Sequence, residues 1–194
     1  MKLSKKLSLT LTLLTFTAVA PAQANDDHVA PATEFANSTL ASWVASEQVL
    51  SALREQNAKH AGLSQSDIDA MDQQWRSETE AGSQPMIDEV LGREISAFLR
   101  DRQEETEGLV LEAFVMDNKG LNVGQSEVTS DYWQGDEAKW QKTYGSSQAT
   151  VFVDEVEEDE STQTFLSQVS MSIVDPDTGD VIGAITVGLD VEGL

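Results

Sequence analysis

Side chains that could form a ligand-binding site are concentrated in one stretch of the chain, from Thr129 to Tyr144. A pocket for a small molecule needs apolar walls and a few directed polar groups. The stretch supplies both types, through Tyr132, Trp133, Trp140, Tyr144, Asp131, Asp136 and Glu137. Binding residues tend to lie on loops held by a rigid scaffold. The alternative is that the aromatic rings only seal this segment onto its sheet and leave no cavity.

Two groups of residues can be separated within this stretch. Trp140 and Tyr144 are four residues apart, so on a helix they share one face, and packing is their simpler role. Asp131, Tyr132 and Trp133 precede that helix, and we predict them as the first contacts of a ligand. All five belong to the candidate ligand-binding set.

The charged residues of the candidate set indicate which charge the ligand should carry. Asp190, at the end of the last apolar segment, joins Asp131 as a carboxylate of the candidate set. Carboxylates beside aromatic rings suit an ammonium group, through ion pairing and cation–π contact. The nearby cations are Lys139 and Lys142, for which solvation is the simpler interpretation. We therefore expect an amine or an amino acid, in preference to a dicarboxylate.

Two acidic segments are candidates for cation binding. The run from Asp154 to Glu160 could collect divalent cations through its carboxylate oxygens, but a solvated hairpin tip that blocks edge pairing is the favoured interpretation. Asp175, Asp177 and Asp180 suggest a calcium loop, yet the EF-hand spacing and its distal glutamate are missing. We expect a turn there and predict no metal site.

Catalysis finds little support in the sequence. His28 and His60 are the two histidines, and neither stands within a serine or cysteine nucleophile motif. There is no phosphate-binding loop or dinucleotide fingerprint, so no cofactor is expected. We predict that the protein is not an enzyme; a secreted hydrolase with a carboxylate pair is the weakest alternative.

Composition excludes several classes of partner. The chain has 194 residues, a net charge of −22 and no cysteine, and 40% of its residues are hydrophobic. Such an acidic surface repels phosphate backbones and anionic lipid, so nucleic acid and membrane surfaces are excluded as partners. The absence of cysteine rules out disulfides and thiolate chemistry. The hydrophobic content is that of a folded domain.

The first 24 residues have the three parts of a secretory signal peptide. Lys2, Lys5 and Lys6 form the basic start, residues 7–20 are apolar, and Ala22-Gln23-Ala24 is a cleavage site. The apolar stretch is shorter than the ~20 residues that span a bilayer. We expect cleavage, a periplasmic protein without membrane insertion, a flexible lead-in over residues 25–34, and one domain over residues 35–194.

Helices are expected in the first half of that domain. Apolar residues recur at steps of three and four from Phe35 to Leu53, from Ile68 to Trp75, and from Ile87 to Leu99 after Pro85. The second of these helices should begin near Ser64 or Ser66 and end at Gly82. The stripe on the first helix packs on its own domain or forms a parallel dimer, so a homodimer remains open.

Strands are expected after Gly108. Residues 109–116 and 121–123 flank a turn and form a hairpin, residues 136–143 form a helix, and residues 150–156, 162–174 and 181–189 form a meander. Val169, Met171 and Ile173 alternate with Gln168, Ser170 and Ser172, as one buried and one wet face require. We predict an α+β domain: a PAS-like five-stranded antiparallel sheet with long N-terminal helices.

Three motifs resemble those of Cache domains, also called PDC sensors, which are PAS-like extracellular sensor modules. They are Val115-Met116-Asp117-Asn118-Lys119-Gly120-Leu121, Thr129-Ser130-Asp131-Tyr132-Trp133-Gln134-Gly135-Asp136-Glu137, and the closing segment from Asp177 to Asp190. The resemblance runs from about Phe35 to the C-terminus. It implies a small-molecule pocket between the segment after the hairpin and the sheet.

This resemblance leads to the expected function. Cache modules usually sit in membrane receptors ahead of an output part, whereas we expect this chain to be a standalone periplasmic member, since it ends at Leu194. The expected function is binding of a small molecule and transfer of the ligand-bound state to a partner, with a membrane receptor as the candidate. The alternatives are a structural or interaction protein with a filled pocket, and divalent-cation binding through the acidic hairpin.

Overall fold

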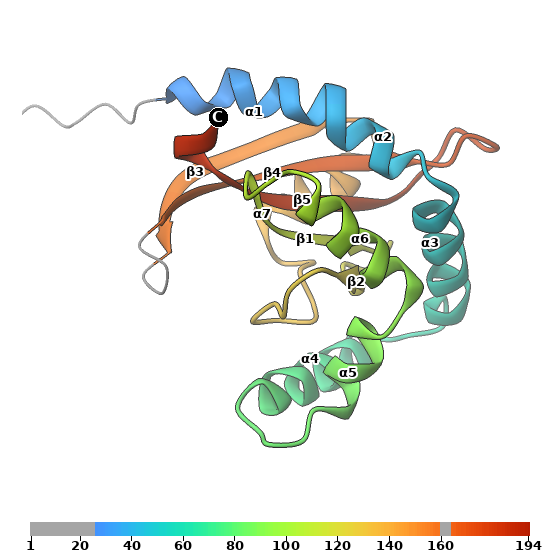
Figure 1. Ribbon diagram of the computed structural model, residues 1–194. Helices are drawn as coiled ribbons and strands as arrows, with labels where there is room; N and C mark the ends of the chain where they lie inside the picture. Colours follow the sequence, from blue (N-terminus) through green and yellow to red (C-terminus); the bar gives the residue numbers. More distant parts are fainter. Residues whose placement is uncertain (1–25, 160–163) are drawn as a thin grey trace, which may run out of the picture.

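The computed structural model describes residues 26–159 and 164–194. Helices make up the first half of the described chain, and a five-stranded antiparallel sheet makes up most of the second half (Figure 1). This confirms the predicted α+β class. The predicted signal peptide and the end of the acidic hairpin, residues 160–163, lie outside the described residues.

An N-terminal helical segment lies along one face of the sheet (Figure 1). Its successive parts are η1 (Asp26–His28), α1 (Val29–Phe35), the π-helical η2 (Ala36–Leu40) and α2 (Ala41–Val44). Residues 26–34, expected as a flexible lead-in, are helical here because Ala32 packs fully buried against the sheet. The helix therefore begins about nine residues before its expected start.

Four further helices follow. They are α3 (Glu47–His60), α4 (Gln65–Thr79), α5 (Pro85–Leu91) and α6 (Glu94–Glu104). Ser64, one of the two predicted starts, caps α4 and forms a capping box with Asp67, and the helix ends at Thr79, three residues before the predicted Gly82. The expected third helix is divided at Gly92 and Arg93, which separates α5 from α6. Figure 1 shows α4 and α5 at the end of the molecule farthest from α1.

The strands are β1 (Val110–Met116), β2 (Asn122–Gln125), β3 (Val151–Asp159), β4 (Thr164–Val174) and β5 (Val181–Asp190). Their order in the sheet is β2-β1-β5-β4-β3, and every neighbouring pair is antiparallel. The short helices α7 (Ala138–Gln141) and η3 (Tyr144–Ser146) lie between β2 and β3, and η4 (Val191–Gly193) follows β5.

The two faces of the sheet differ in composition. The helix face packs on α1 to α3 and α6 through buried apolar residues such as Val115, Val169, Ile173, Ile185 and Val187. The opposite face, which we name the polar face, carries Glu112, Phe114 and Met116 from β1, Gln168, Ser170 and Ser172 from β4, and Ala184, Thr186 and Gly188 from β5. The segment that contains α7 and η3 lies against this polar face.

The apolar stripe of the N-terminal helices is used within the domain. Trp43, Leu50 and Leu53 are at most 5% exposed and belong to the core on the helix face. The exposed residues of α1 are Val29, Ala30 and Glu34. In the part of the chain that the structure describes, no helix combines the length and apolar character needed to cross a membrane.

Candidate functional site

Tyr132 lies in the interior of the protein. Its side chain is 1% exposed and stacks on Trp75 of α4, with ring centroids 5.3 Å apart. The backbone N–H groups of Tyr132 and Trp133 both donate to Asp72 Oδ1, at 3.0 Å each. Burial raises the pKa of the Tyr132 phenol to about 12, although the nearby Arg93 guanidinium acts in the opposite direction. Tyr132 therefore anchors its segment onto α4.

The neighbours of Tyr132 also have partners within the protein. The Asp131 carboxylate forms an ion pair with Arg76 of α4, with 3.1 Å between Oδ1 and Nη1. Trp133 donates its indole N–H to the backbone carbonyl of Lys119, at 2.8 Å. The three predicted first contacts thus lie together, and they join the segment after β2 to α4 and to the turn before β2.

Trp140 and Tyr144 form a second group. Their rings lie 5.0 Å apart and pack against Phe114, Met116 and Ala184 on the polar face. The indole N–H of Trp140 donates to the backbone carbonyl of Asp117, at 3.0 Å. The spacing of four residues brings the two rings together, as the sequence predicts for a packed pair.

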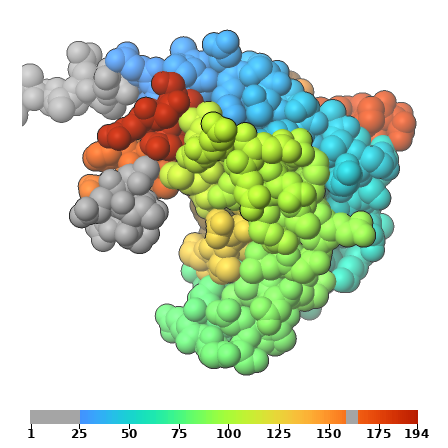
Figure 2. Space-filling model, in the orientation of Figure 1, coloured from blue at the N-terminus to red at the C-terminus, as the bar shows by residue number. Residues whose placement is uncertain are grey.

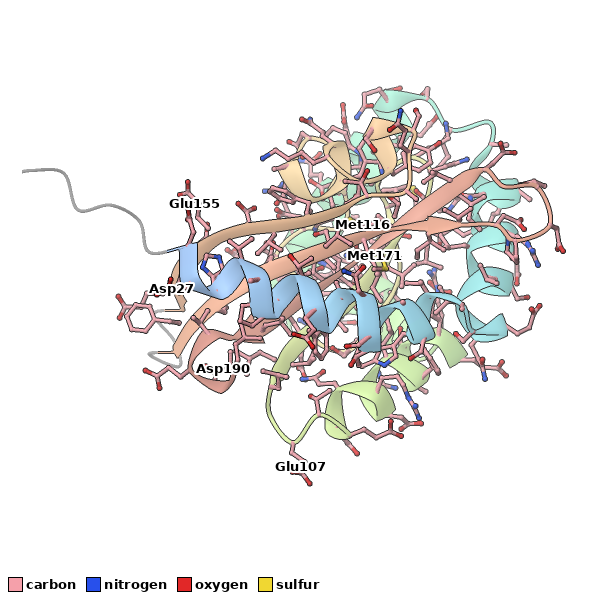
Figure 3. All side chains as sticks on the ribbon, turned by 90° about the horizontal axis from the view of Figure 1, so that it is seen from above. Asp27, Glu107, Met116, Glu155, Met171 and Asp190 are labelled. Atoms are coloured by element: carbon pink, nitrogen blue, oxygen red, sulfur yellow. The ribbon has the colours of Figure 1, made fainter. Side chains whose placement is uncertain are left out.

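Asp190 lies apart from the other candidate residues. It ends β5, and its Oδ1 accepts a hydrogen bond from the backbone N–H of Glu192. Six residues separate it from Ala184, which contacts the Trp140 group, and this corresponds to about 20 Å along a strand. Figure 3 shows Asp190 at the same end of the molecule as Asp27 and Glu155, away from Met116.

The polar face contains further polar residues that are not part of the predicted ligand-binding set. Ser170 and Thr186 are fully buried and share a hydrogen bond of 2.8 Å. Gln168 donates to Glu112 Oε1, at 2.9 Å. Gly188 lies between these two on β5, and a Cβ atom at this position would stand only 2.8 Å from Glu112 Cγ. The absence of a side chain at Gly188 therefore makes room for the contact.

The predicted wet face of β4 is wrong for its central part. Ser170 is 0% exposed and Ser172 is 5% exposed. The period-two pattern identified two different faces correctly, but it could not show that the segment after β2 folds back over the polar one. Two features of the sequence could have indicated a buried polar face: the alternation of small polar and apolar residues in β4, and the single polar Thr186 between apolar residues of β5.

An amide group beside the polar face lacks a partner. Gln125 is fully buried and pairs with Phe114 in the register of β1 and β2. Its Oε1 accepts from Asn122 Nδ2 at 3.0 Å. In the part of the chain that the structure describes, neither Gln125 Nε2 nor Asn122 Oδ1 has a hydrogen-bond partner. An unused donor and an unused acceptor in one buried cluster are a feature that needs an explanation.

Two lysines lie over the polar face, and one of them, Lys139, is largely buried there. The side chain of Lys139 is 11% exposed, and its Nζ pairs with Glu137 at 2.7 Å and lies 5.5 Å from the Phe114 ring centroid. Lys142 Nζ lies 4.0 Å from the centroid of the Phe152 ring. The solvated interpretation of Lys139 is therefore wrong: α7 brings this cation onto the sheet.

The structure tests the prediction for one of the two acidic segments and not for the other. The segment from Asp175 to Asp180 is a turn, as expected. Asp175 and Asp177 both accept hydrogen bonds from Arg54, which tie this turn to α3. Across residues 26–159 and 164–194, no three histidine, aspartate or glutamate residues are placed to hold a metal ion. The run from Asp154 to Glu160 extends into residues outside that range, so divalent-cation binding by the whole run stays a prediction.

Comparison with known proteins gives matches among solved structures. No protein-family model and no curated protein matches the chain. The sensor domain of the V. cholerae histidine kinase DctB is similar over 86% of this chain, with 11% identity and a TM-score of 0.42. The sensory domain of the Campylobacter jejuni chemoreceptor Tlp3 is similar over 83% of this chain, with 13% identity and a TM-score of 0.41.

A third similar structure was solved with a ligand. It is the ligand-binding domain of the Pseudomonas fluorescens chemoreceptor CtaA in complex with L-serine, with 64% of this chain covered, 10% identity and a TM-score of 0.38. This chain matches 54%, 64% and 58% of the three solved chains, respectively. All three are sensory or ligand-binding domains, which is the kind of domain that the sequence motifs resemble. At such identities the likeness concerns the fold alone.

Proposed function

We propose that the protein binds a small polar solute on the polar face of the sheet, beneath the segment that follows β2. The observation that carries this proposal is the composition of that face. Ser170, Thr186 and Gln125 are fully buried there, although apolar residues would close a core at lower cost. Gln125 Nε2 has an unused donor among the described residues, which a bound solute or a water molecule would satisfy.

We infer that a solute reaches this face from the end of the sheet that contains Asp190. Figure 2 shows a hollow in the surface beside the segment after β2, drawn yellow. Glu112 and Gln168 are both partly exposed, and they lie on β1 and β4 toward the end of the sheet that contains Asp190. We place the solute between this pair and α7, where Lys139 approaches Phe114.

The charges on the polar face favour an amino acid over a simple amine. Lys139 offers an ammonium group to a ligand carboxylate, and Glu112 offers a carboxylate to a ligand ammonium. Asp131 and Asp190 were the expected partners of the ammonium group, but Asp131 is paired with Arg76 and Asp190 caps η4. Glu112 therefore replaces them in the proposal, and Trp140 and Tyr144 supply the apolar wall.

The proposal also includes the location of the protein and its role in signalling. We place the protein in the periplasm, after removal of residues 1–24, as a sensor-type domain that passes its ligand-bound state to a membrane receptor partner. The segment after β2 contacts the polar face, α4 and the turn before β2, so a solute that moves it changes several surfaces together. Periplasmic location is tested by cell fractionation, with cytoplasmic retention of the mature protein as the contrary result.

The competing function is that of an interaction protein with a filled interior. It is favoured by the aromatic residues, since the indole N–H groups of Trp133 and Trp140 both donate to backbone carbonyls and so are not free for a ligand. Under this alternative, ordered water satisfies Gln125 and no solute stabilises the protein.

Thermal-shift and calorimetric titration with amino acids, amines and dicarboxylates tests the proposal. We expect stabilisation by at least one amino acid, and a loss of affinity of about tenfold or more in Glu112→Gln and in Lys139→Met, since each removes a charge-assisted hydrogen bond. Gly188→Ala should weaken binding by displacing Glu112. Lys59→Met, on the exposed side of α3, is the control and should bind normally.

Two results would contradict the proposal. One is the absence of stabilisation by any member of the panel while the protein remains folded by circular dichroism. The other is stabilisation by dicarboxylates alone, because the Glu112 carboxylate would then face a ligand of the same charge.

A further inference from the structure

A second hollow lies at the end of the molecule where the N-terminal helix meets the sheet. Its volume is about 430 Å³, and it is formed by η1, the outer parts of β3 and β4, and η4. We infer that this hollow is a binding site for an organic ammonium ion that carries an apolar body. The inference does not depend on the proposed function, because the polar face and this hollow have no residue in common.

The charge around the hollow selects a cation. Four exposed carboxylates line it, and no lysine or arginine is among its lining residues, all of which the structure describes: the carboxylates are those of Asp26, Asp27, Glu155 and Glu192. They come from three separate elements, η1, β3 and η4. Figure 3 shows Asp27 and Glu155 at this end of the molecule. Carboxylates converging on a low-dielectric surface raise the local concentration of cations.

The interior of the hollow selects an apolar body. Val156 and Phe165 line it and are 37% and 45% exposed. These are two of the five large hydrophobic residues found exposed in the described part of the chain. Exposed apolar side chains gathered at one place mark a contact surface. The Phe165 ring also offers a cation–π contact to an ammonium group.

His28 provides an independent observation. Its side chain lines the hollow, is only 7% exposed, and places Nε2 3.0 Å from the backbone carbonyl oxygen of Asp154. A carbonyl accepts, so Nε2 carries the hydrogen and Nδ1 is the acceptor of the neutral ring. Within the described residues Nδ1 has no donor. A ligand N–H group that enters the hollow, with a small shift of the ring, would supply that donor.

Titration followed by amide chemical shifts tests the inference, with three probes. They are 2-phenylethylammonium, ethylammonium and phenylacetate, which together separate the charge from the apolar body. We expect saturable binding of 2-phenylethylammonium, with shifts at Val156, Phe165 and Val191, and at least tenfold weaker binding of the other two probes. The double variant Asp27→Asn with Glu192→Gln and the single variant Phe165→Ser should each weaken binding about tenfold.

A matched variant distinguishes a local site from a general effect of charge. Asp69→Asn with Glu80→Gln removes the same number of exposed charges from the region of α4 and should leave the affinity unchanged. The inference is overturned if this control weakens binding as much as the double variant at the hollow does. It is also overturned if phenylacetate binds equally well, or if the shifts fall on the polar face. All these positions are exposed, so folding is expected to survive.

Discussion

At the scale of single residues, the candidate site is defined by which polar atoms already have partners. Asp131, Trp133 and Trp140 all direct their polar atoms to protein groups, so they hold their segment in place. Lys139 and Glu112 also have protein partners, Glu137 and Gln168, but they carry their charges onto the polar face. Gln125 differs from all of these, because its Nε2 has no partner among the described residues. The residue type alone does not distinguish the two roles. The distinction depends on what each atom contacts.

The ionisation of Tyr132 gives a prediction at this scale. Its pKa is about 12 because burial disfavours the phenolate, so the folded protein keeps a proton that the unfolded chain loses near pH 10. The free energy of unfolding should therefore fall as the pH rises above about 10. Ultraviolet titration of the phenolate should show one tyrosine ionising near pH 12, and Tyr132→Phe should remove that step.

The second tyrosine serves as the internal control for this titration. Burial also raises the pKa of Tyr144, which is only half-buried. The ionisation of Tyr144 should survive in Tyr132→Phe, because this substitution removes only the other phenol. Ionisation of both tyrosines at the ordinary value near pH 10 would contradict the burial of Tyr132 against Trp75.

At the scale of elements, charged side chains attach two helices to the turns and loops that join the strands. Arg54 of α3 donates to both carboxylate oxygens of Asp175, at 2.9 and 2.6 Å, and to Asp177 at 2.7 Å, in the turn between β4 and β5. Asp72 of α4 accepts from the backbone of the segment after β2. These contacts fix where the helices lie against the strand ends, which apolar packing alone leaves less specific.

The contact between α3 and the turn predicts a pH dependence. The hydrogen bond from Arg54 holds the pKa of Asp175 at about 2, below its ordinary value of 3.8. The stabilisation is therefore fully present above about pH 4 and is lost as the pH falls toward 2. Urea unfolding of the natural chain and of Arg54→Gln should show a difference in midpoint that is largest above pH 4 and shrinks below it.

The exposed Lys59→Gln variant is the control for this measurement, since it removes a cation from the same helix. Its difference from the natural chain should be small at every pH. A midpoint difference for Arg54→Gln that stays constant between pH 6 and pH 2.5 would show that the contact contributes through packing of the side chain, and not through the ionised carboxylate.

At the scale of the whole molecule, acidity is spread over the surface of one folded domain. The net charge is −22, and the exposed sides of the helices and of the β3–β4 hairpin carry much of it. Like charges at this density repel one another and destabilise the compact state. We therefore expect this charge to repel large anionic partners, while specific sites depend on local groups.

Screening of this repulsion gives a prediction for the whole molecule. The distance over which exposed charges interact falls from about 10 Å at 0.1 M salt to about 3 Å at 1 M. The unfolding temperature should therefore rise by a few degrees when sodium chloride is raised over that range. The variant Asp69→Asn with Glu80→Gln, with two charges fewer, should show a smaller rise, and a fall in both proteins would contradict the explanation.

The sequence by itself determined the class of fold and most of its elements. The periods of 3.6 and 2, the cap at Ser64 and the turn at Asp175 are local signals, since each depends on residues that are close in the chain. They placed α4 and the five strands and identified the segment after β2 as the one to examine. The motifs added the resemblance to PAS-like sensor domains, and the predicted five-stranded antiparallel sheet is present.

The tertiary structure decided which predicted residues meet and which polar groups are buried. It separated Asp190 from Trp140, made residues 26–34 helical by packing Ala32 on the sheet, and buried Ser170 under the segment after β2. It also brought His28 to Asp154, across 126 positions of the chain. These outcomes depend on contacts between distant parts of the chain. The local alternation of polar and apolar residues is the same whether the polar face of a strand is exposed to solvent or covered by another segment.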